Sequence, residues 1–256
     1  MNNCFETEKF RFEYLESHTD SSVLWESHCH SDFEMIAVME GDISIMLEGK
    51  NYRLTEKQAA IIFPLSYHTV TSNKQGVYKR VTAQFGQKAI PDVVLPYFSK
   101  DTMGALVMFP YKGEKLKNIC TGREKTAFSP LADALMIELL YDALQVKQNS
   151  AEIETDEFVH GCVMYIDSHL EEKITLDDIA KCMMRSKSSF CHLFEKKMKI
   201  SPKQYILQKK LAYADMLINK GVPVSEVSCK IGYDNYSDFY RMYRKYFGKS
   251  PTKRHS

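Results

Sequence analysis

The stretch SDFYRMYRKYFGKSP, residues 237–251, decides how the C-terminal part of this chain folds. A similar stretch, SSFCHLFEKKMKISP, occupies residues 188–202, and the two align without a gap at an offset of 49 residues. The alignment pairs residues of the same type, namely Ser188 with Ser237, Phe190 with Phe239, Lys196 with Lys245, and Ser201-Pro202 with Ser250-Pro251. Aromatic and basic residues at helical spacing thus occur twice, which indicates a duplicated short helix.

Each copy follows a shorter helical segment and a turn. These segments are residues 176–183 and 224–231, and Gly232 marks the second bend. Small residues, Ala180 and Ser228, stand where two helices must approach closely. A short helix, a turn and a basic helix make a helix-turn-helix unit, so the sequence predicts two such units.

The second helix of each unit has two distinct faces. Its inward stripe is predicted to consist of Phe190, Leu193 and Phe194 in the first unit and Phe239, Met242 and Tyr243 in the second. Between the units, Ser201-Pro202 is a helix start signal, and the helix is expected to run to about Gly221. Nineteen helical residues span nearly 30 Å. This is the scale needed to hold two reading helices about 34 Å apart in successive major-groove segments.

The basic residues are concentrated at the same end of the chain. Residues 181–256 hold 17 Lys and Arg against 5 Asp and Glu, a net charge of +12, whereas the whole chain has a net charge of +1. Charge alone would be better explained by a solvated helical face. Together with the repeat, it indicates a segment that binds a polyanion.

Residues 8–86 show the alternation that is typical of β-strands. Ile43, Ile45 and Leu47 alternate with more polar neighbours, and turn signals occur at residues 40–42, 48–51 and 72–76. Short strands at such spacing are typical of a small sandwich or barrel. The N-terminal part is therefore expected to be all-β.

Beyond Phe85 the spacing becomes helical. Residues 130–148 place Leu131, Leu135, Leu139 and Leu140 on one predicted side. This stripe suits packing on the β-domain and packing across a dimer axis, and both can hold at once. The acidic segment 151–157 is a predicted linker, which gives domains at residues 1–150 and 151–256.

Composition argues against several classes of protein. The first twenty residues have charges and no apolar run, unlike a signal peptide, and no later stretch reaches the roughly 18 apolar residues of a membrane span. The 7 cysteines form no CxxC pair, which favours reduced thiols over a structural zinc site. We therefore expect a cytoplasmic protein with no membrane partner and no cofactor.

Five motifs cover most of residues 158–256: Ile174-Thr175-Leu176-Asp177-Asp178-Ile179-Ala180, Ser201-Pro202-x-x-Tyr205-Ile206, Lys210-Leu211-x-x-Ala214-x-x-Leu217, Ile231-Gly232-Tyr233 and Phe239-x-x-x-Tyr243-x-Lys245-x-x-Gly248-x-Ser250-Pro251. This segment resembles the DNA-binding domain of the AraC/XylS family of bacterial transcription regulators. The resemblance implies that bases are read by Lys187, Ser188, Cys191 and His192 in the first unit and by Tyr236, Ser237, Tyr240 and Arg241 in the second.

Among these residues, Arg241 is the strongest candidate for base reading, since a bidentate arginine on guanine is the commonest specific contact. Ser188 is short and Cys191 is a weak hydrogen-bonding group, so the first unit is expected to read few bases. Side chains that contact only phosphate or water are the alternative at each position. Two departures from the family pattern are Lys210, where arginine is usual, and Arg254, near a usual aromatic position.

The N-terminal part carries a second resemblance. His28, His30 and Glu34 form an HxHx3E array, followed by Gly41 and later by His68. This pattern resembles the cupin signature over residues 20–86. On a strand His28 and His30 would share one face, and three imidazoles with one carboxylate would suit a divalent metal. Three interpretations stay open: an organic effector without metal, a functional metal, and purely structural histidines.

The effector site is predicted to comprise Trp25, His28, His30, Glu34, Tyr67, His68 and Tyr78. Its aromatic rings could stack on a sugar or an aromatic effector, and they could equally belong to the core. The favoured interpretation contains no metal, and the candidate ligands, if one binds, are His28, His30, Glu34 and His68.

The sequence thus predicts an α+β multidomain protein. It combines an N-terminal cupin-like β-barrel and flanking helices with a C-terminal all-α domain of seven helices and two helix-turn-helix units. We expect a transcription regulator rather than an enzyme, specifically an activator that responds to a sugar or another metabolite. Its expected partners are double-stranded DNA, the effector, a second copy in a homodimer, and RNA polymerase. The alternative is a metal-dependent cupin enzyme or metal sensor fused to a DNA-binding module.

Overall fold

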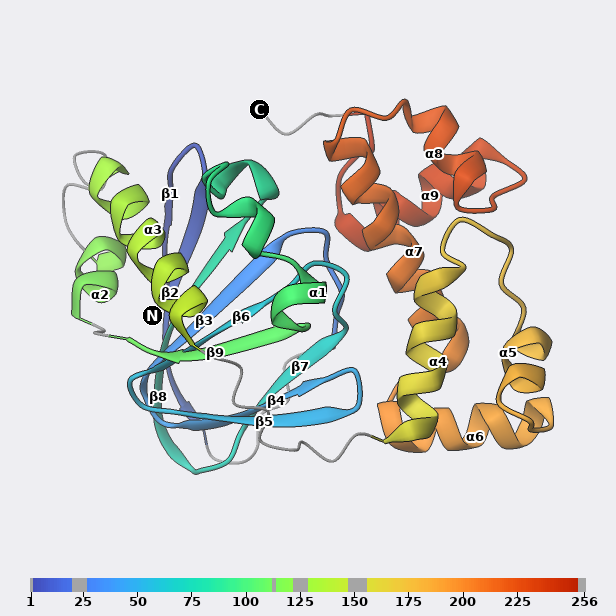
Figure 1. The fold of residues 1–256 in the computed structure, drawn as a ribbon, viewed down its shortest axis with the longest axis horizontal. Coiled ribbons are helices and arrows are strands. Elements are labelled where there is room, and N and C mark those ends of the chain that lie inside the picture. Colours follow the sequence, from blue (N-terminus) through green and yellow to red (C-terminus); the bar gives the residue numbers. More distant parts are fainter. Residues whose placement is uncertain (1, 20–26, 112–113, 122–128, 147–155, 253–256) are drawn as a thin grey trace. The chain divides into compact units, whose positions relative to one another are not determined.

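A computed structural model describes residues 2–19, 27–111, 114–121, 129–146 and 156–252 of the chain (Figure 1). Its described residues form two compact units. Unit 1 comprises the described residues within 1–27, 32–47 and 51–153, and unit 2 comprises those within 28–31, 48–50 and 154–256. The predicted boundary at residue 150 falls among residues 147–155, which lie outside the described residues.

Unit 1 is rich in β-strands, as the alternating pattern predicted. The strands are β1 (Asn2–Glu6), β2 (Phe10–Thr19), β3 (Phe33–Glu40), β4 (Asp42–Leu47), β5 (Lys50–Thr55), β6 (Gln58–Ile62), β7 (His68–Ser72), β8 (Gly76–Phe85) and β9 (Leu106–Pro110). The turn that joins β4 to β5 includes Glu48 and Gly49, which belong to unit 2. The apolar run Leu106–Phe109 does not alternate, so the sequence pattern missed β9.

The strands form two sheets. The larger has the order β1-β2-β8-β3-β6-β9 and the smaller has the order β5-β4-β7. Alternate residues of β3 enter two different cores, because Met35 and Ala37 pack with residues of the helices while Ile36 and Val38 pack with residues of the smaller sheet. The central sheet is therefore buried on both faces.

The prediction of a closed barrel is wrong for the described strands, whose hydrogen bonds form two separate sheets. A sheet with apolar residues on both faces can bury one face against a second sheet and the other against helices, so its strands need not close into a barrel. A strand was also expected at His28 and His30. The structure has only an isolated bridge at His28. The backbone of the intervening Cys29 instead bonds the hydroxyl of Tyr246, which accepts from its N–H and donates to its carbonyl.

Short helical segments complete unit 1. They are η1 (Gln87–Ala89), η2 (Leu95–Tyr97), α1 (Lys100–Met103), α2 (Glu114–Thr121) and α3 (Ser129–Gln145). Helix α2 contacts β1, β2 and β8, and α3 contacts β9 and α2 (Figure 1). Leu135, Leu139 and Leu140 are buried on this side as predicted, but Leu131 is 55% exposed and faces away from the core.

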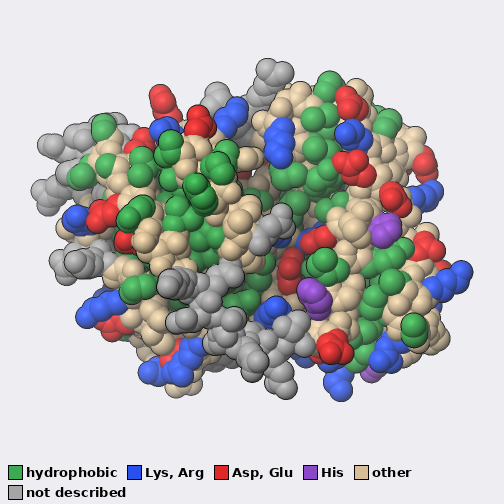
Figure 2. Space-filling model, viewed as in Figure 1, with side chains coloured by type: hydrophobic (Ala, Val, Ile, Leu, Met, Phe, Trp, Pro, Cys, Tyr) green, Lys and Arg blue, Asp and Glu red, His purple; other side chains and the backbone are tan. Residues whose placement is uncertain are grey.

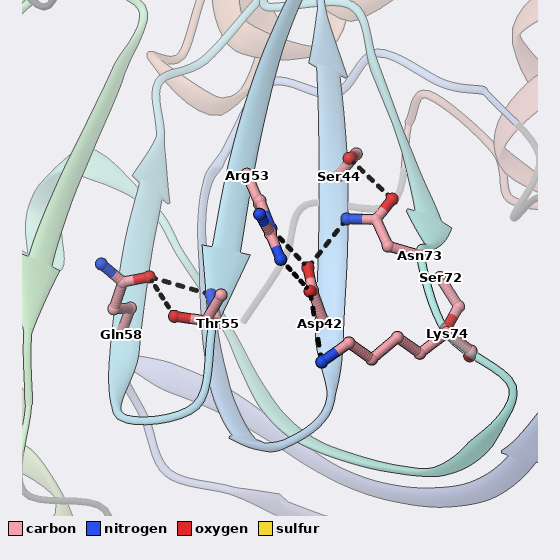
Figure 3. Close-up of polar contacts among 8 residues, drawn as sticks. All are labelled: Asp42, Ser44, Arg53, Thr55, Gln58, Ser72, Asn73 and Lys74. Atoms are coloured by element: carbon pink, nitrogen blue, oxygen red, sulfur yellow. Dashed lines mark hydrogen bonds and ion pairs between the residues drawn. The ribbon is translucent and has the colours of Figure 1, made fainter.

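A polar network ties together the strands of the smaller sheet (Figure 3). The buried carboxylate of Asp42 accepts from Arg53 Nε at 3.0 Å, Arg53 Nη2 at 2.6 Å and Asn73 Nδ2 at 2.9 Å. The hydrogen bonds from Arg53 are the main cause that lowers the pKa of Asp42 to about 2. This charged centre fixes the ends of β4, β5 and the β7–β8 turn.

Unit 2 has six helices within residues 156–252, the part of the C-terminal region that the structure describes. They are α4 (Glu157–Ser168), α5 (Leu176–Cys182), α6 (Lys187–Met198), α7 (Pro202–Asn219), α8 (Val224–Lys230) and α9 (Tyr236–Phe247). Seven helices were expected, the seventh after Ser250-Pro251. Pro251 and Thr252 lie in a turn, and residues 253–256, including Arg254, are outside the described residues.

Helix α7 is the central element of unit 2. It contacts α6, α8 and α9, and nearly all of one face is buried. Its start is as predicted, since the Ser201 hydroxyl accepts from the Gln204 N–H at 3.3 Å and Pro202 follows. It ends at Asn219 rather than Gly221, so its 18 residues span about 27 Å.

Among the helices that the structure describes, none combines the length and the apolar composition that crossing a membrane requires.

Candidate nucleic-acid interface

Two helix-turn-helix units are present in unit 2, one from α5 and α6 and the other from α8 and α9. The first helix has 7 residues in both units and the second has 12 in both. Each turn contains one residue with left-handed backbone, which is Met184 at φ 52° in the first unit and Gly232 at φ 81° in the second. The duplication seen in the sequence is therefore a duplication of the fold.

Side-chain caps set the start of each second helix. The Ser186 hydroxyl accepts from the Ser189 N–H at 3.3 Å at the start of α6. Asn235 Oδ1 accepts from the Ser237 N–H at 2.7 Å at the start of α9. A capped N-terminus removes unpaired N–H groups and keeps the first turn ordered. This turn carries residues that the family resemblance assigns to base reading.

The inward faces of α6 and α9 are buried as predicted. Phe190, Phe194, Phe239 and Tyr243 are buried, whereas Leu193 and Met242 are half-buried. Ala180 and Ser228 are also buried, in agreement with the close helix approach expected there. The cores of the two units thus use equivalent positions, and this fixes which faces of α6 and α9 remain outside.

The residues assigned to base reading lie on the outward faces. In α6, Lys187, Ser188 and His192 are exposed and Cys191 is half-buried; in α9, Tyr236, Ser237 and Arg241 are exposed and Tyr240 is half-buried. No one of the eight belongs to the core, so the structure leaves this set able to meet a ligand. Their roles in base reading stay predictions.

Acidic side chains pair with the two strongest basic candidates. Lys187 Nζ lies 2.8 Å from Asp177 Oδ2, and this pairing raises the pKa of Lys187. Arg241 Nη2 donates to Asp238 Oδ1 at 2.6 Å. On the face that Figure 2 shows, basic and acidic side chains are interspersed rather than segregated. The sequence analysis identified these two basic residues but not their pairing with Asp177 and Asp238. The second pairing had a signal, because Asp238 precedes Arg241 by three residues, the spacing of a helical ion pair.

Helix α7 fixes the second unit through a buried carboxylate. Asp215 on α7 accepts hydrogen bonds from the hydroxyl of Tyr243 on α9 and from Asn219 Nδ2 at 3.1 Å. Tyr243 donates to Oδ1, whereas Ser31, at 2.5 Å, donates to Oδ2, the same oxygen that accepts from Asn219. Burial, followed by the hydrogen bond to Asp215, raises the pKa of Tyr243, so its phenol stays protonated and remains a donor.

Two lysines of α7 are buried for structural reasons. Lys209 Nζ pairs with Glu48 Oε1 at 3.0 Å and with Asp167 Oδ1 at 2.6 Å. Lys210 Nζ donates to the backbone carbonyls of Ile231, at 2.8 Å, and Glu172. Burial lowers the pKa of Lys210. A cation at position 210 therefore ties the end of α8 to the segment before α5, which explains why a lysine can stand where the family usually has arginine.

The described residues of the predicted effector set are divided between the two units, and each unit is described by itself. In unit 1, His68 Nε2 lies 2.9 Å from Glu34 Oε2, and His68 Nδ1 bonds the carbonyl of Ser66 at 2.9 Å. In unit 2, the rings of His28 and His30 are 5.4 Å apart. These four side chains have the composition of a metal-ligand set. The carbonyl of Ser66 can only accept, so Nδ1 carries a hydrogen and Nε2 is the nitrogen turned toward the carboxylate.

The two aromatic candidates that the structure describes are buried. Tyr67 and Tyr78 are each 1% exposed, and Tyr78 packs in the core between the two sheets. Trp25 lies outside the described residues. A pocket of about 270 Å³ in unit 1 is lined instead by Met39, Glu40, Lys79, Lys117 and Asn118. An effector role for the predicted set stays a prediction.

Comparison with known proteins supports the assignment of the C-terminal part. Residues 179–254 match a family model described as a helix-turn-helix domain. This region begins inside α5, so it covers most of the first helix-turn-helix unit and all of the second. The C-terminal part of this chain is therefore similar to known helix-turn-helix domains, as the duplicated helical stretch predicted.

Several relatives are transcriptional regulators. The uncharacterized HTH-type transcriptional regulator YdiP of Escherichia coli (strain K12) is 30% identical over 137 residues, which cover 53% of this chain and 45% of YdiP. The lactose operon transcription activator of Staphylococcus xylosus is 26% identical over 47% of this chain and 46% of its own length. The uncharacterized HTH-type transcriptional regulator YdeC of Bacillus subtilis (strain 168) is 21% identical over 88% of this chain and 84% of its own length. The match to YdiP thus spans less than half of that relative's length.

Proposed function

We propose that this chain is a sequence-specific DNA-binding transcription regulator of the AraC type, and not an enzyme. The observation that carries the proposal is the pair of helix-turn-helix units whose second helices have buried inner faces and exposed polar outer faces. The relatives named above are transcriptional regulators, which supports the same conclusion.

In this proposal α6 and α9 enter successive major-groove segments, and α7 holds them apart. An α-helix fits the major groove, where each base pair presents its own donor and acceptor pattern. The 18 residues of α7 give a rigid element of about 27 Å between two units whose targets recur every 34 Å or so along the duplex. Basic residues outside the reading faces would contact phosphates and set the register.

Binding to a selected duplex tests this function directly. The full chain is used to select sites from a random duplex library, and affinities for a selected and a random duplex are then compared. Arg241→Ala is expected to weaken binding to the selected duplex by about 1–3 kcal/mol and to leave random duplex nearly unchanged. Lys245→Ala, on an exposed position of the same helix, is the control and should weaken binding to both duplexes alike. A chain that selects no sequence would refute the proposal.

We further propose that a small metabolite controls this activity and that the chain acts as an activator. The name of the Staphylococcus xylosus relative, a lactose operon activator, supports a sugar. Within unit 2, the segment His28–Ser31 is hydrogen-bonded to α9 through Tyr246 and to α7 through Asp215. A ligand that engages His28 or His30 would therefore alter contacts made directly to a DNA-reading helix.

A thermal-shift screen against sugars tests the effector. A sugar that raises the melting temperature of the wild-type chain, and changes its affinity for the selected duplex, would support the proposal. The variant Tyr246→Phe keeps the ring but loses the hydrogen bonds to Cys29, so it should bind the same sugar without the change in DNA affinity. Measuring the metal content of the purified chain distinguishes a sugar effector from a metal effector. Stoichiometric metal would support the second, with His28, His30, Glu34 and His68 as candidate ligands.

We propose that the chain acts as a homodimer through α3 and that the DNA-bound dimer contacts RNA polymerase. The outer face of α3 exposes Leu131, Ile137 and Tyr141, at 55%, 42% and 58%. An exposed apolar stripe on a helix is typical of an interaction site. The paired change Ile137→Glu and Tyr141→Glu should convert the dimer to a monomer in light scattering, and an unchanged mass would contradict this role for α3.

A further inference from the structure

We propose that Asp238 is a positioning residue, which orients Arg241 for base reading in the second unit. This inference rests on the proposed function, because it assigns a role within sequence-specific DNA binding. Asp238 was in no predicted site, and the resemblance to AraC-type regulators assigns reading only to its neighbours.

The geometry places the two side chains in one turn of α9. Asp238 is the third residue of the helix and Arg241 follows one turn later, with Arg241 Nη2 donating to Asp238 Oδ1 at 2.6 Å. The side chain of Arg241 is 75% exposed, and that of Asp238 is 50% exposed. A guanidinium has five N–H donors in a planar fork. One bond to Asp238 fixes the plane of the fork and leaves donors to meet O6 and N7 of guanine.

Orientation matters because arginine is long and flexible. A free side chain of this kind loses rotamer entropy when it is immobilised on a base, and a partner that already holds the side chain reduces this loss. The same carboxylate has an opposite effect on DNA in general, since a negative charge near the phosphates weakens nonspecific binding. Asp238 would therefore weaken binding to DNA of any sequence through its charge, and it would partly restore binding to the one sequence that Arg241 reads. Both effects increase the difference in affinity between that sequence and all others.

The first unit shows a related but weaker arrangement. Lys187, the first residue of α6, pairs with Asp177 of α5 across the turn at 2.8 Å. The gapless alignment places Ser189 where the second unit has Asp238, so the reading helix of the first unit lacks a carboxylate at this position. A lysine is a point charge without the planar fork of arginine, so holding it confers less geometric selectivity. Positioning by an acid is therefore assigned to the second unit.

A structural role for Asp238 is the alternative. An acid in the first turn stabilises a helix through its dipole, and the cap of α9 is already supplied by Asn235. The two roles differ in their dependence on Arg241. A helix-stabilising acid acts whatever residue stands at position 241, whereas a positioning acid has no effect on base preference once Arg241 is removed.

The test measures affinities of the full chain for the selected duplex and for a random duplex of equal length. Asp238→Ala should bind the random duplex about twofold more tightly. Its preference for the selected over the random duplex should fall about fivefold. Asp234→Ala is the matched control: it removes the same charge four residues earlier, from a side chain that is 89% exposed and pairs with Lys173. Its preference should stay at the wild-type value.

The double variant completes the experiment. In an Arg241→Ala background, Asp238→Ala should leave the preference for the selected duplex unchanged. In the wild-type background, Asp238→Asn removes the charge with little change in side-chain size, and it should lower the preference as Asp238→Ala does. Equal changes on both duplexes, or a loss of preference that persists without Arg241, would overturn the positioning role. A wild-type chain without any preference would instead refute the proposed function and this inference with it.

Discussion

Removing the hydroxyl of Tyr243 should weaken the attachment of α9 to α7. In Tyr243→Phe the ring remains in the core, where it packs 5.7 Å from Phe239 and 4.6 Å from Phe247, measured between ring centroids. Only the hydrogen bond to Asp215 is lost. The change therefore isolates one polar contact between α9 and α7.

The magnitude follows from what Asp215 retains. A hydrogen bond to a charged group contributes about 1.5–3 kcal/mol. After the change Asp215 still accepts from Ser31 at 2.5 Å and from Asn219 at 3.1 Å, and Lys249 Nζ lies at 3.9 Å, so the carboxylate is not left without partners. The lower end of the range applies, and we expect a loss of about 1.5–2 kcal/mol in the free energy of unfolding.

Urea unfolding of the full chain, followed by the helical circular dichroism signal, measures this loss. Tyr240→Phe is the matched control, because Tyr240 is on the outward face of the same helix and loses the same atom. Its stability should stay within about 0.5 kcal/mol of the wild-type value, as is usual for surface changes. If Tyr243→Phe were as stable as Tyr240→Phe, the carboxylate of Asp215 would not be what holds α9 to α7.

Three further changes test the supporting structure. Asp42→Asn should destabilise the chain by about 1 kcal/mol at pH 7. Because the folded pKa of Asp42 is lowered from 3.8 to about 2, its contribution is present above about pH 4 and disappears as the pH falls toward 2, so unfolding curves of variant and wild type should converge there. Ser201→Ala removes the cap of α7 and should cost about 1 kcal/mol in thermal unfolding, with Ser201→Asp restoring it. Lys210→Met should cost about 2 kcal/mol in urea unfolding by leaving the carbonyl of Ile231 unpaired, whereas Lys210→Arg should be nearly neutral; equal losses would contradict the capping role.

Local signals predicted unit 2 well. Caps such as Ser201, turn residues such as Gly232 and the stripe that contains Phe239 each act within a few residues, so the helices and their buried faces can be read from the sequence. The helix-turn-helix pairing followed from the repeat. The ends of helices were predicted less accurately. Helix α7 ends at Asn219 rather than at Gly221, because several hydrogen-bonding patterns are possible in the last turn of a helix.

The arrangement of unit 1 depended on contacts that a local pattern does not encode. The residues of β3 are apolar on both faces, and only the partners of each face distinguish a layered sheet from a barrel. The failure of the strand at His28 has a similar origin, because the backbone of Cys29 is bonded by Tyr246, 217 residues away in the chain. Likewise, the pairing of Asp177 with Lys187 crosses a turn and has no local signal, whereas that of Asp238 with Arg241 could have been predicted from their three-residue spacing.

The two helix-turn-helix units share a scaffold but differ in what their outer faces can recognise. In α6 the assigned residues include Ser188 and Cys191, which offer short or weak hydrogen-bonding groups, whereas α9 offers Tyr240 and Arg241. Specificity comes from bidentate contacts to base edges, and backbone contacts only add affinity. Under the proposed function, discrimination should therefore be concentrated in the half of a selected DNA site that α9 contacts, while α6 adds mainly affinity. Base substitutions in the two halves of a selected site would then have unequal effects, and equal effects would mean that α6 reads sequence through groups other than these.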